Sequence, residues 1–305
     1  MSGLVTLVAG DARVVVAPAV GGAVVAFSWR NNAVLRVTPD DAIASGRVRE
    51  FASYPLVPFS NRIANATLAT RDGRSHALIR NFGDHPHTIH GVGWQREWNV
   101  DAVEAQSVCM SHAHRPESNG PTSWPFAYDA VQSITVRADA HEATLTLTLA
   151  IRNVDSTPFP FGLGWHPFFP KDAITRLGFH AATYWATDDT RLPTTSHDAS
   201  GDAAFDPPRV VGDTSLDHVY AGWDGRARLE YPERNLAVTI EADTTCAHLV
   251  VYAPPAGSTI AVEPVTHMTD AFNRFARGET GTGTRLLTPG SAYSCTMRIA
   301  VTPST

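Results

Sequence analysis

The chain is 305 residues long, and its content of 43% hydrophobic and 18% charged residues is typical of a globular protein with a substantial core. With 24 basic and 30 acidic side chains its formal charge is −6, so the composition gives no argument for a basic surface that binds nucleic acid or an anionic membrane. It has no apolar run of about 18 residues, and its start lacks the features of a signal peptide, so we expect a cytoplasmic protein. Cys109, Cys246 and Cys295 have no metal or disulfide spacing and are predicted to be reduced thiols.

Alternation of apolar and polar residues predicts β-strands along most of the chain. The clearest case is residues 144–151, T-L-T-L-T-L-A-I, where the apolar side chains share one face and the threonines the other. This pattern is typical of a half-buried antiparallel strand. Weaker alternation predicts further strands at 13–16, 24–29, 131–136, 236–240, 248–252 and 293–301. Hairpin turns are predicted at Gly10-Asp11, Asp72-Gly73 and Asp224-Gly225.

Helical patterns are few and short. One turn is predicted from Asp40 to about Ser45, and a second helix over residues 271–277, after Asp270. No strand–helix alternation long enough for a parallel doubly wound sheet is present.

Two long segments, 111–124 and 187–215, show no regular pattern and are expected to be functional rims or mobile flaps. The chain has no internal repeat and no low-complexity linker. The sequence therefore predicts one all-β domain of packed antiparallel sheets over residues 1–305.

A proline- and phenylalanine-rich stretch, P-F-P-F-G-L-G-W-H-P-F-F-P over residues 158–170, places His166 in an aromatic wall. Pro167 restricts the backbone beside it, and a histidine titrates near neutrality, so a rigid, partly desolvated histidine is suited to proton transfer. The alternative is a core histidine that is satisfied by a backbone carbonyl.

Three further residues have the chemistry of a site. Glu263 ends an apolar strand, I-A-V-E-P, where burial would raise its pKa toward the range of a general base. Arg62, in P-F-S-N-R-I-A-N, offers donors for sugar hydroxyls or a carboxylate; the alternative is a structural Arg–Asp pair. Asp217, in S-L-D-H-V-Y, is expected either in a cleft or as a turn aspartate that caps local backbone.

Three histidines, His85, His87 and His90, fall within six residues and raise the question of a metal. The pair His85 and His87 shares one strand face, but the next carboxylate lies ten residues past His87, which is poor spacing for a metal site. His90 precedes Trp94 and Trp98, whose rings are suited to packing against the C–H face of a sugar. We therefore predict no metal ligands here.

Taken in order, these motifs resemble the aldose 1-epimerase (galactose mutarotase) family, and in particular a bacterial subgroup of it. The resemblance spans about residues 55–300 and rests on several short motifs. They are N-R-I from Asn61, H-G from His90, W-H-P-F-F around His166, L-D-H-V-Y around Asp217, and E-P from Glu263 followed by D-A-F-N.

The resemblance implies a large antiparallel β-sandwich with an open cleft, in which a free hexose such as galactose or glucose changes anomer by ring opening. It implies no cofactor and no partner besides the sugar, with the chain a monomer or weak homodimer. The roles implied are Glu263 as general base, His166 as general acid, His90 assisting near the ring oxygen, and Arg62, Asp217 and Asn61 binding the substrate.

Alternatives remain open at this level. The same scaffold is suited to a catalytically silent carbohydrate-binding protein. The chain also departs from the family pattern, with Gly164 and Pro170 at two positions near the histidine motif, which leaves the preferred sugar open. A sugar phosphate is a further alternative, but no cluster of arginine and lysine is evident near the motifs.

Overall fold

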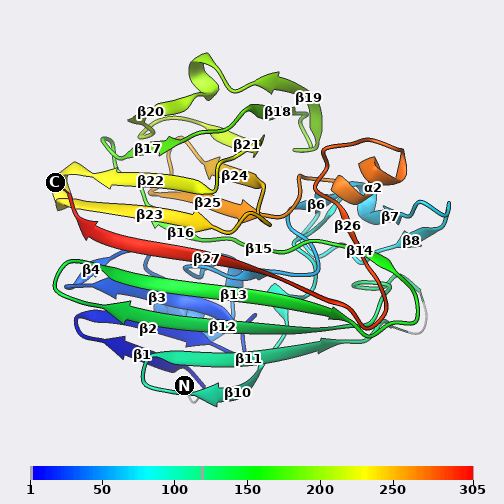
Figure 1. The fold of residues 1–305 in the computed structure, drawn as a ribbon, viewed down its shortest axis with the longest axis horizontal. Helices are drawn as coiled ribbons and strands as arrows, with labels where there is room; N and C mark the ends of the chain where they lie inside the picture. Colours follow the sequence, from blue (N-terminus) through cyan, green and yellow to red (C-terminus); the bar gives the residue numbers. More distant parts are fainter. Residues whose placement is uncertain (1–2, 118–119, 305) are drawn as a thin grey trace.

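Two large antiparallel sheets make up most of the protein, as the computed structural model of residues 3–117 and 120–304 shows (Figure 1). The first sheet has nine strands, in the spatial order β10 (Asn99–Val103), β11 (Ser107–His114), β12 (Tyr128–Ala138), β13 (Ala143–Asn153), β27 (Ala292–Pro303), β23 (Leu236–Ala242), β22 (Arg226–Tyr231), β17 (Arg176–Phe179) and β20 (Phe205–Val210). In Figure 1 this sheet forms the front layer.

The second sheet lies behind the first in Figure 1 and carries most of the motif residues. Its order is β19 (Pro193–Asp198), β18 (Thr183–Thr187), β21 (Leu216–Ala221), β24 (His248–Ala253), β25 (Thr259–Val265), β15 (Gly164–Trp165) and β5 (Pro55–Leu56). A further strand, β16 (Phe168–Pro170), pairs with β25.

Smaller elements complete the fold. A four-stranded sheet consists of β1 (Val5–Ala9), β2 (Ala12–Ala17), β3 (Ala23–Trp29) and β4 (Asn32–Ala33). Three strand pairs are β6 (Arg62–Ile63) with β9 (Thr88–Ile89), β7 (Thr67–Ala69) with β8 (Ser75–Ala77), and β14 (Phe159–Phe161) with β26 (Arg285–Leu287). The helices are α1 (Asp40–Ser45) and α2 (Ala271–Ala276), with 3₁₀ turns at Val48–Glu50, Ala64–Ala66, Gly93–Gln95, Gly201–Ala203 and Pro232–Arg234.

The core lies between the two sheets, and it explains the alternation in the sequence. On β13 the leucines are buried and the threonines are only partly buried. Phe179 of β17 meets Tyr220 of β21 with ring centroids 4.8 Å apart, so the two layers are in contact. Trp165 of β15 donates a hydrogen bond of 3.3 Å to Gln132 of β12, which joins the layers again. Burying a large apolar side chain stabilises a fold by about 1.5–3 kcal/mol, so this alternation is a strong constraint.

All the strands predicted from alternation are confirmed, and most are longer than predicted. Both helices are confirmed, with α2 ending one residue earlier than expected. The three cysteines are free thiols. None of the helices in the described part of the chain has both the length and the apolar character needed to cross a membrane.

Three local predictions were wrong. The segment 111–124 begins inside β11, which continues to His114, and the segment 187–215 contains both β19 and β20. Strands β19 and β20 lie at the edges of their sheets, and most of their residues are polar or proline. Burial therefore imposes little alternation of apolar and polar residues on them. The turn at Asp224-Gly225 is not a hairpin, because β21 and β22 belong to different sheets.

Candidate active site

A cleft of about 880 Å³ collects all the predicted site residues. Its wall contains Asn61 and Arg62 before and on β6, His90 after β9, His166 between β15 and β16, Asp217 on β21 and Glu263 on β25. Tyr54, Trp94 and Phe168 add aromatic surface to the same wall. Residues more than 200 positions apart in sequence, such as Asn61 and Glu263, thus share one cleft.

His166 and Glu263 form the centre of the cleft, with Nε2 of the histidine 3.2 Å from Oε1 of the glutamate. Neighbouring strands bring them together, because Gly164 of β15 pairs with Val265 of β25. A Cβ on Gly164 would lie only 2.7 Å from the carbonyl oxygen of Pro264, so this close approach requires glycine. The backbone N–H of His166 also donates to the carbonyl of Tyr54 at 3.0 Å.

Burial shifts both groups toward their neutral forms. Glu263 is only 2% exposed, and this burial, reinforced by the charge of Asp217, raises the pKa of its carboxyl well above the usual value. Burial, reinforced by the nearby charge of Arg36, lowers the pKa of His166 to about 3. Two groups in contact that both favour their neutral forms are suited to share one proton. Oε2 of Glu263 and Nδ1 of His166 have no hydrogen-bond partner among the described residues.

His90 is a neutral hydrogen-bond donor. Its Nδ1 accepts a hydrogen bond of 3.0 Å from the backbone N–H of Asn61, so the ring proton is on Nε2. Burial, and then the charges of His166 and Arg62, lower the pKa of His90 well below its usual value. Its ring packs edge-on against the ring of His166, with centroids 5.3 Å apart.

Asn61 positions Arg62 through two contacts. Its side-chain oxygen accepts hydrogen bonds from the backbone N–H of Arg62 at 2.9 Å and from Nη1 at 3.0 Å. Asn61 has φ 58°, a left-handed conformation that asparagine tolerates better than most residues. Nε of Arg62 is buried without a partner in the described part of the chain. Asp217 forms its ion pair with Arg191 instead, at 3.6 Å, so the structural Arg–Asp pair considered for Arg62 is absent from the described residues.

The interpretation that no arginine cluster lies near the motifs was wrong. Five arginines line the cleft: Arg36, Arg47, Arg49, Arg62 and Arg191. Three of them come from the segment between β4 and β5, and one from the β18–β19 hairpin, which are far from the motifs in sequence. No spacing signal relates these positions, so the sequence could not reveal the cluster.

The histidines before His90 have a structural role. Nδ1 of His87 accepts a hydrogen bond of 2.9 Å from the backbone N–H of Asn65, which has the left-handed φ of 52°. The rings of His85 and His87 pack edge to face at 4.9 Å. Among residues 3–117 and 120–304, no three histidine, cysteine or acidic side chains are grouped closely enough to hold a metal ion.

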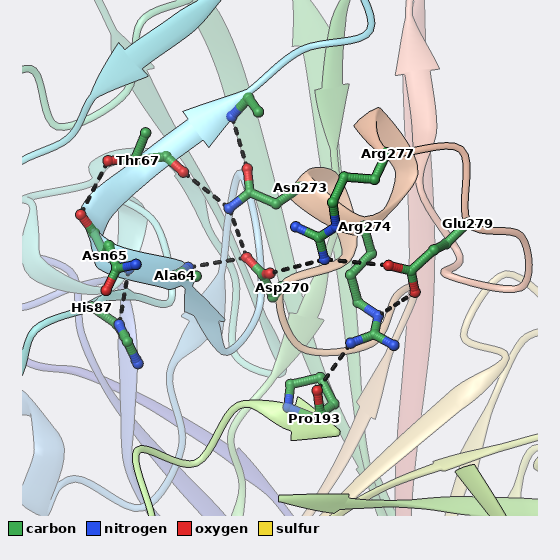
Figure 2. Close-up of polar contacts among 11 residues, drawn as sticks. Ala64, Asn65, Thr67, His87, Pro193, Asp270, Asn273, Arg274, Arg277 and Glu279 are labelled. Carbon is green, nitrogen blue, oxygen red and sulfur yellow. Dashed lines mark hydrogen bonds and ion pairs between the residues drawn. The ribbon is translucent and has the colours of Figure 1, made fainter. Parts of the chain in front are cut away.

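The D-A-F-N motif, residues 270–273, holds the backbone of residues 64–69, as Figure 2 shows. Oδ1 of Asp270 accepts hydrogen bonds from the backbone N–H of Ala64 at 3.0 Å and from the Asn273 amide at 2.7 Å. That amide also donates to the carbonyl of Thr67 at 2.9 Å, and its oxygen accepts from the N–H of Ala69 at 2.7 Å. The clamp made by Asp270 and Asn273 therefore fixes the backbone from 64 to 69.

Asp270 and the helix α2 that follows it also contact two other parts of the site. The backbone N–H of Asp270 donates to the carbonyl of Arg62 at 2.9 Å, beside the cleft. Nη1 of Arg274 donates to the carbonyl of Pro193 at 2.9 Å, which ties α2 to the hairpin that carries Arg191 (Figure 2). Sequence analysis assigned no role to these residues, although the short motif that contains them was part of the resemblance.

Replacing Asn273 by alanine is expected to lower the free energy of unfolding by about 2–4 kcal/mol, because it removes one buried and two partly buried hydrogen bonds and leaves the N–H of Ala69 without its acceptor. Denaturant unfolding measures this change. Asn99→Ala, at an exposed position on β10, is the matched control and should change stability little. Equal stability of the two variants would contradict the clamp.

The fold and the cleft together define a sandwich of the galactose mutarotase-like class, with a buried histidine–glutamate pair among polar and aromatic side chains. A family model described as aldose 1-epimerase matches residues 3–300, and the chain belongs to this family.

Similar proteins and solved structures match most of the chain. The uncharacterized Escherichia coli K12 protein YphB is 29% identical over 289 residues, which cover 92% of this chain and 93% of the relative. The uncharacterized protein YihR of the same organism is 26% identical over 72% of this chain and 70% of its own length. An Escherichia coli K12 crystal structure, provisionally named an aldose 1-epimerase, has a TM-score of 0.87 at 27% identity and covers 98% of this chain and 99% of that one. A galactose mutarotase-like protein from Clostridium acetobutylicum shares the fold, with a TM-score of 0.82 at 19% identity, covering 98% of this chain and 95% of that one.

Proposed function

We propose that the protein is an aldose 1-epimerase that interconverts the α and β anomers of a free hexose such as galactose or glucose by general acid–base ring opening. The observation that carries this proposal is the His166–Glu263 pair. Its 3.2 Å contact and its burial suit the pair to share a single proton, which provides one proton donor and one acceptor in a sugar-sized cleft.

The reaction requires two proton transfers, one at each of the two oxygens that are bonded to the anomeric carbon. Glu263 accepts the proton of the anomeric hydroxyl through Oε2, while His166 donates a proton from Nε2 to the ring oxygen. The bond from C1 to the ring oxygen then breaks to give the open-chain aldehyde. Rotation about C1–C2 presents the other face, and the reverse transfers close the ring. The pair holds one proton before and after each step, so no external proton is needed.

The closeness of the pair suits this chemistry, because the hydroxyl oxygen and the ring oxygen are both bonded to C1. For Glu263 to act as the base, the shared proton must first reside on His166. At 3.2 Å this is a single transfer within the pair. The neutral donor of His90 lies beside His166 and stabilises charge that develops near the ring oxygen.

The remaining groups hold the sugar. The guanidinium of Arg62, oriented by Asn61, and the carboxylate of Asp217 bind hydroxyls on the Glu263 side of the cleft. The rings of Tyr54 and Trp94, with centroids 5.4 Å apart, pack against the C–H face of the sugar.

The experiment that tests the proposal is polarimetry of freshly dissolved α-glucose and α-galactose, with the spontaneous rate subtracted. Acceleration by the protein supports the epimerase. Sugar binding without acceleration would instead indicate the second candidate, a silent carbohydrate-binding protein on the same scaffold.

Replacing Arg62 by lysine is expected to raise KM more than it lowers kcat. Lysine keeps the charge but loses the planar fork, held by Asn61, that contacts two oxygens at once. Steady-state mutarotation kinetics measure both constants. A normal KM with a collapsed kcat would assign Arg62 to the proton chemistry rather than to binding.

Treatment with a chelator is expected to leave the mutarotation rate unchanged. The proposed chemistry uses only the Glu263–His166 pair. The two histidine pairs with ligand spacing, His85 with His87 and His112 with His114, have ring nitrogens engaged by backbone. The rate is measured before and after treatment with a chelator and dialysis. A loss that added zinc or manganese restores would overturn this prediction.

A further inference from the structure

Arg36 is a partly buried cation at the edge of the proposed reaction centre. Its guanidinium carbon lies 3.5 Å from the centroid of the Phe168 ring, and that ring stacks on His166 at 4.3 Å. Nε and Nη2 donate to the carbonyl of Phe51 at 2.9 and 2.6 Å, and Nη2 also donates to the carbonyl of Arg49. These contacts fix the guanidinium in place and leave Nη1 without a partner among the described residues. Burial lowers the pKa of Arg36 to about 10, so the group remains charged at neutral pH.

The cations of the cleft differ in how they are compensated. Arg47 bonds to Asp41 and Glu50, each at 2.5 Å, and Arg191 pairs with Asp217. By contrast, Arg36 and Arg49 form no ion pair in the described part of the chain.

Arg49 lies at the rim, with its guanidinium carbon 4.6 Å from the centroid of the Phe82 ring. Four acidic residues line the wall, and three of them already have partners. Glu50 pairs with Arg47, Asp217 with Arg191 and Glu263 with His166. Only Asp189, among the described acidic residues of the wall, is left to compensate the other arginines. A partly buried cation without an anionic partner is costly. A structure that keeps Arg36 in this state is therefore prepared to bind an anion. The protein as a whole is negative, at −6, so the positive excess is specific to the cleft.

The chemistry of the proposed reaction indicates which part of the sugar meets Arg36. The anomeric hydroxyl faces Glu263, whose neighbours are Asp217 and Arg62, so the C2 side of the ring lies toward those residues. The ring oxygen faces His166, whose charged neighbours are Arg36, which packs on the same Phe168 ring, and, with a smaller effect on its pKa, Arg62. In a hexopyranose the ring oxygen is bonded to C5, and C5 carries C6. The C6 substituent therefore points to the side of Arg36.

Space for a charged substituent exists on that side. A second hollow of about 720 Å³ adjoins the cleft and shares Arg36, Glu50 and Thr259 with it. Glu50 opposes an anion there, but its charge is balanced by Arg47 at 2.5 Å.

From these observations we infer that the preferred substrate is a hexose with an anionic group on C6, a carboxylate or a phosphate, and that Arg36 and Arg49 bind this group. The inference rests on the proposed epimerase function, because the reacting atoms fix the orientation of the sugar. A guanidinium fork is suited to either anion, since both present paired oxygens.

The test compares glucose, glucuronate and glucose 6-phosphate as substrates. Anomer exchange is measured by NMR at pH 7, with the spontaneous rate of each sugar subtracted. The kcat/KM for at least one anionic sugar is expected to exceed that for glucose by roughly ten- to a hundredfold, the effect of hydrogen bonds to a charged group. This preference should shrink as ionic strength rises, because salt screens the attraction.

Two variants report on the proposed binding groups. Arg36→Lys keeps the charge and loses the fork, and Arg49→Gln removes a charge at an exposed position where folding is not at risk. Each should reduce the ratio of kcat/KM for the anionic sugar to that for glucose. Arg137→Gln, at an exposed position on β12 in the other sheet, is the matched control and should leave the ratio unchanged.

The inference is overturned if glucose is used as well as both anionic sugars, or if neither arginine variant changes the ratio. Either result would leave the epimerase function intact. If the protein accelerates none of the three sugars, the proposed function fails, and calorimetry then decides the inference separately. Tighter binding of glucuronate than of glucose that is lost in Arg36→Lys supports the anion site, and equal binding overturns it.

Discussion

Replacing Glu263 by glutamine is expected to slow the catalysed mutarotation by about 10²- to 10⁴-fold, which is ~3–5 kcal/mol of barrier. Glutamine has the shape of the acid but cannot accept the proton of the anomeric hydroxyl. The rate is measured on freshly dissolved α-glucose and α-galactose after the spontaneous rate is subtracted. Because the side chain is 2% exposed and its carboxyl has a raised pKa, the amide replaces a group already inclined to be neutral, and the fold should persist.

The control for this variant is Glu104→Gln, at an exposed position between β10 and β11 on the edge of the nine-stranded sheet. It makes the same chemical change far from the cleft and should keep full activity. If Glu263→Gln retained more than about a tenth of the rate, the loss would be below the range of general base catalysis and the assignment would be wrong.

The second large effect is expected for His166→Asn, again about 10²- to 10⁴-fold, because asparagine cannot deliver a proton to the ring oxygen. His141→Asn, at an exposed position between β12 and β13, is its control. The double variant of His166 and Glu263 should lose much less than the product of the two single losses. Groups 3.2 Å apart that share one proton act as a unit, so removing either disables the pair. Strictly multiplicative losses would contradict this coupling.

The pH dependence of kcat/KM follows from the same pair. One proton is held between the lowered pKa of His166, about 3, and the raised pKa of Glu263. Below the lower limit the pair takes up a second proton and loses its base; above the upper limit it loses its only proton and has no acid. We therefore expect activity to fall on the acid side near pH 3, and on the alkaline side above the ordinary range of a glutamate. The alkaline limb should disappear in His166→Asn, which has no acid left to lose its proton, and the acid limb should disappear in Glu263→Gln, which has no base left to protonate.

The sequence alone determined the features that depend on local pattern. Strand β13 was predictable because burial of one face imposes a period of two on its leucines. The burial of Glu263 was predictable because it follows the apolar run 260–262, although β25 does not end there as predicted and continues to Val265. The short motifs around His90, His166 and Asp217 indicated one cleft through their resemblance to a family, and all of these residues do line it.

Only the tertiary structure decided the relations between distant residues. Arg36, Arg49 and Arg191 have no motif, and they enter the cleft from the segment between β4 and β5 and from the β18–β19 hairpin. The shift of the pKa of His166 to about 3 likewise depends on its burial and on Arg36, which is 130 positions earlier in the chain. The physical reason is that charge compensation, hydrogen-bond partners and desolvation are set by distance in space, whereas a sequence pattern reports only the periodicity of its own segment.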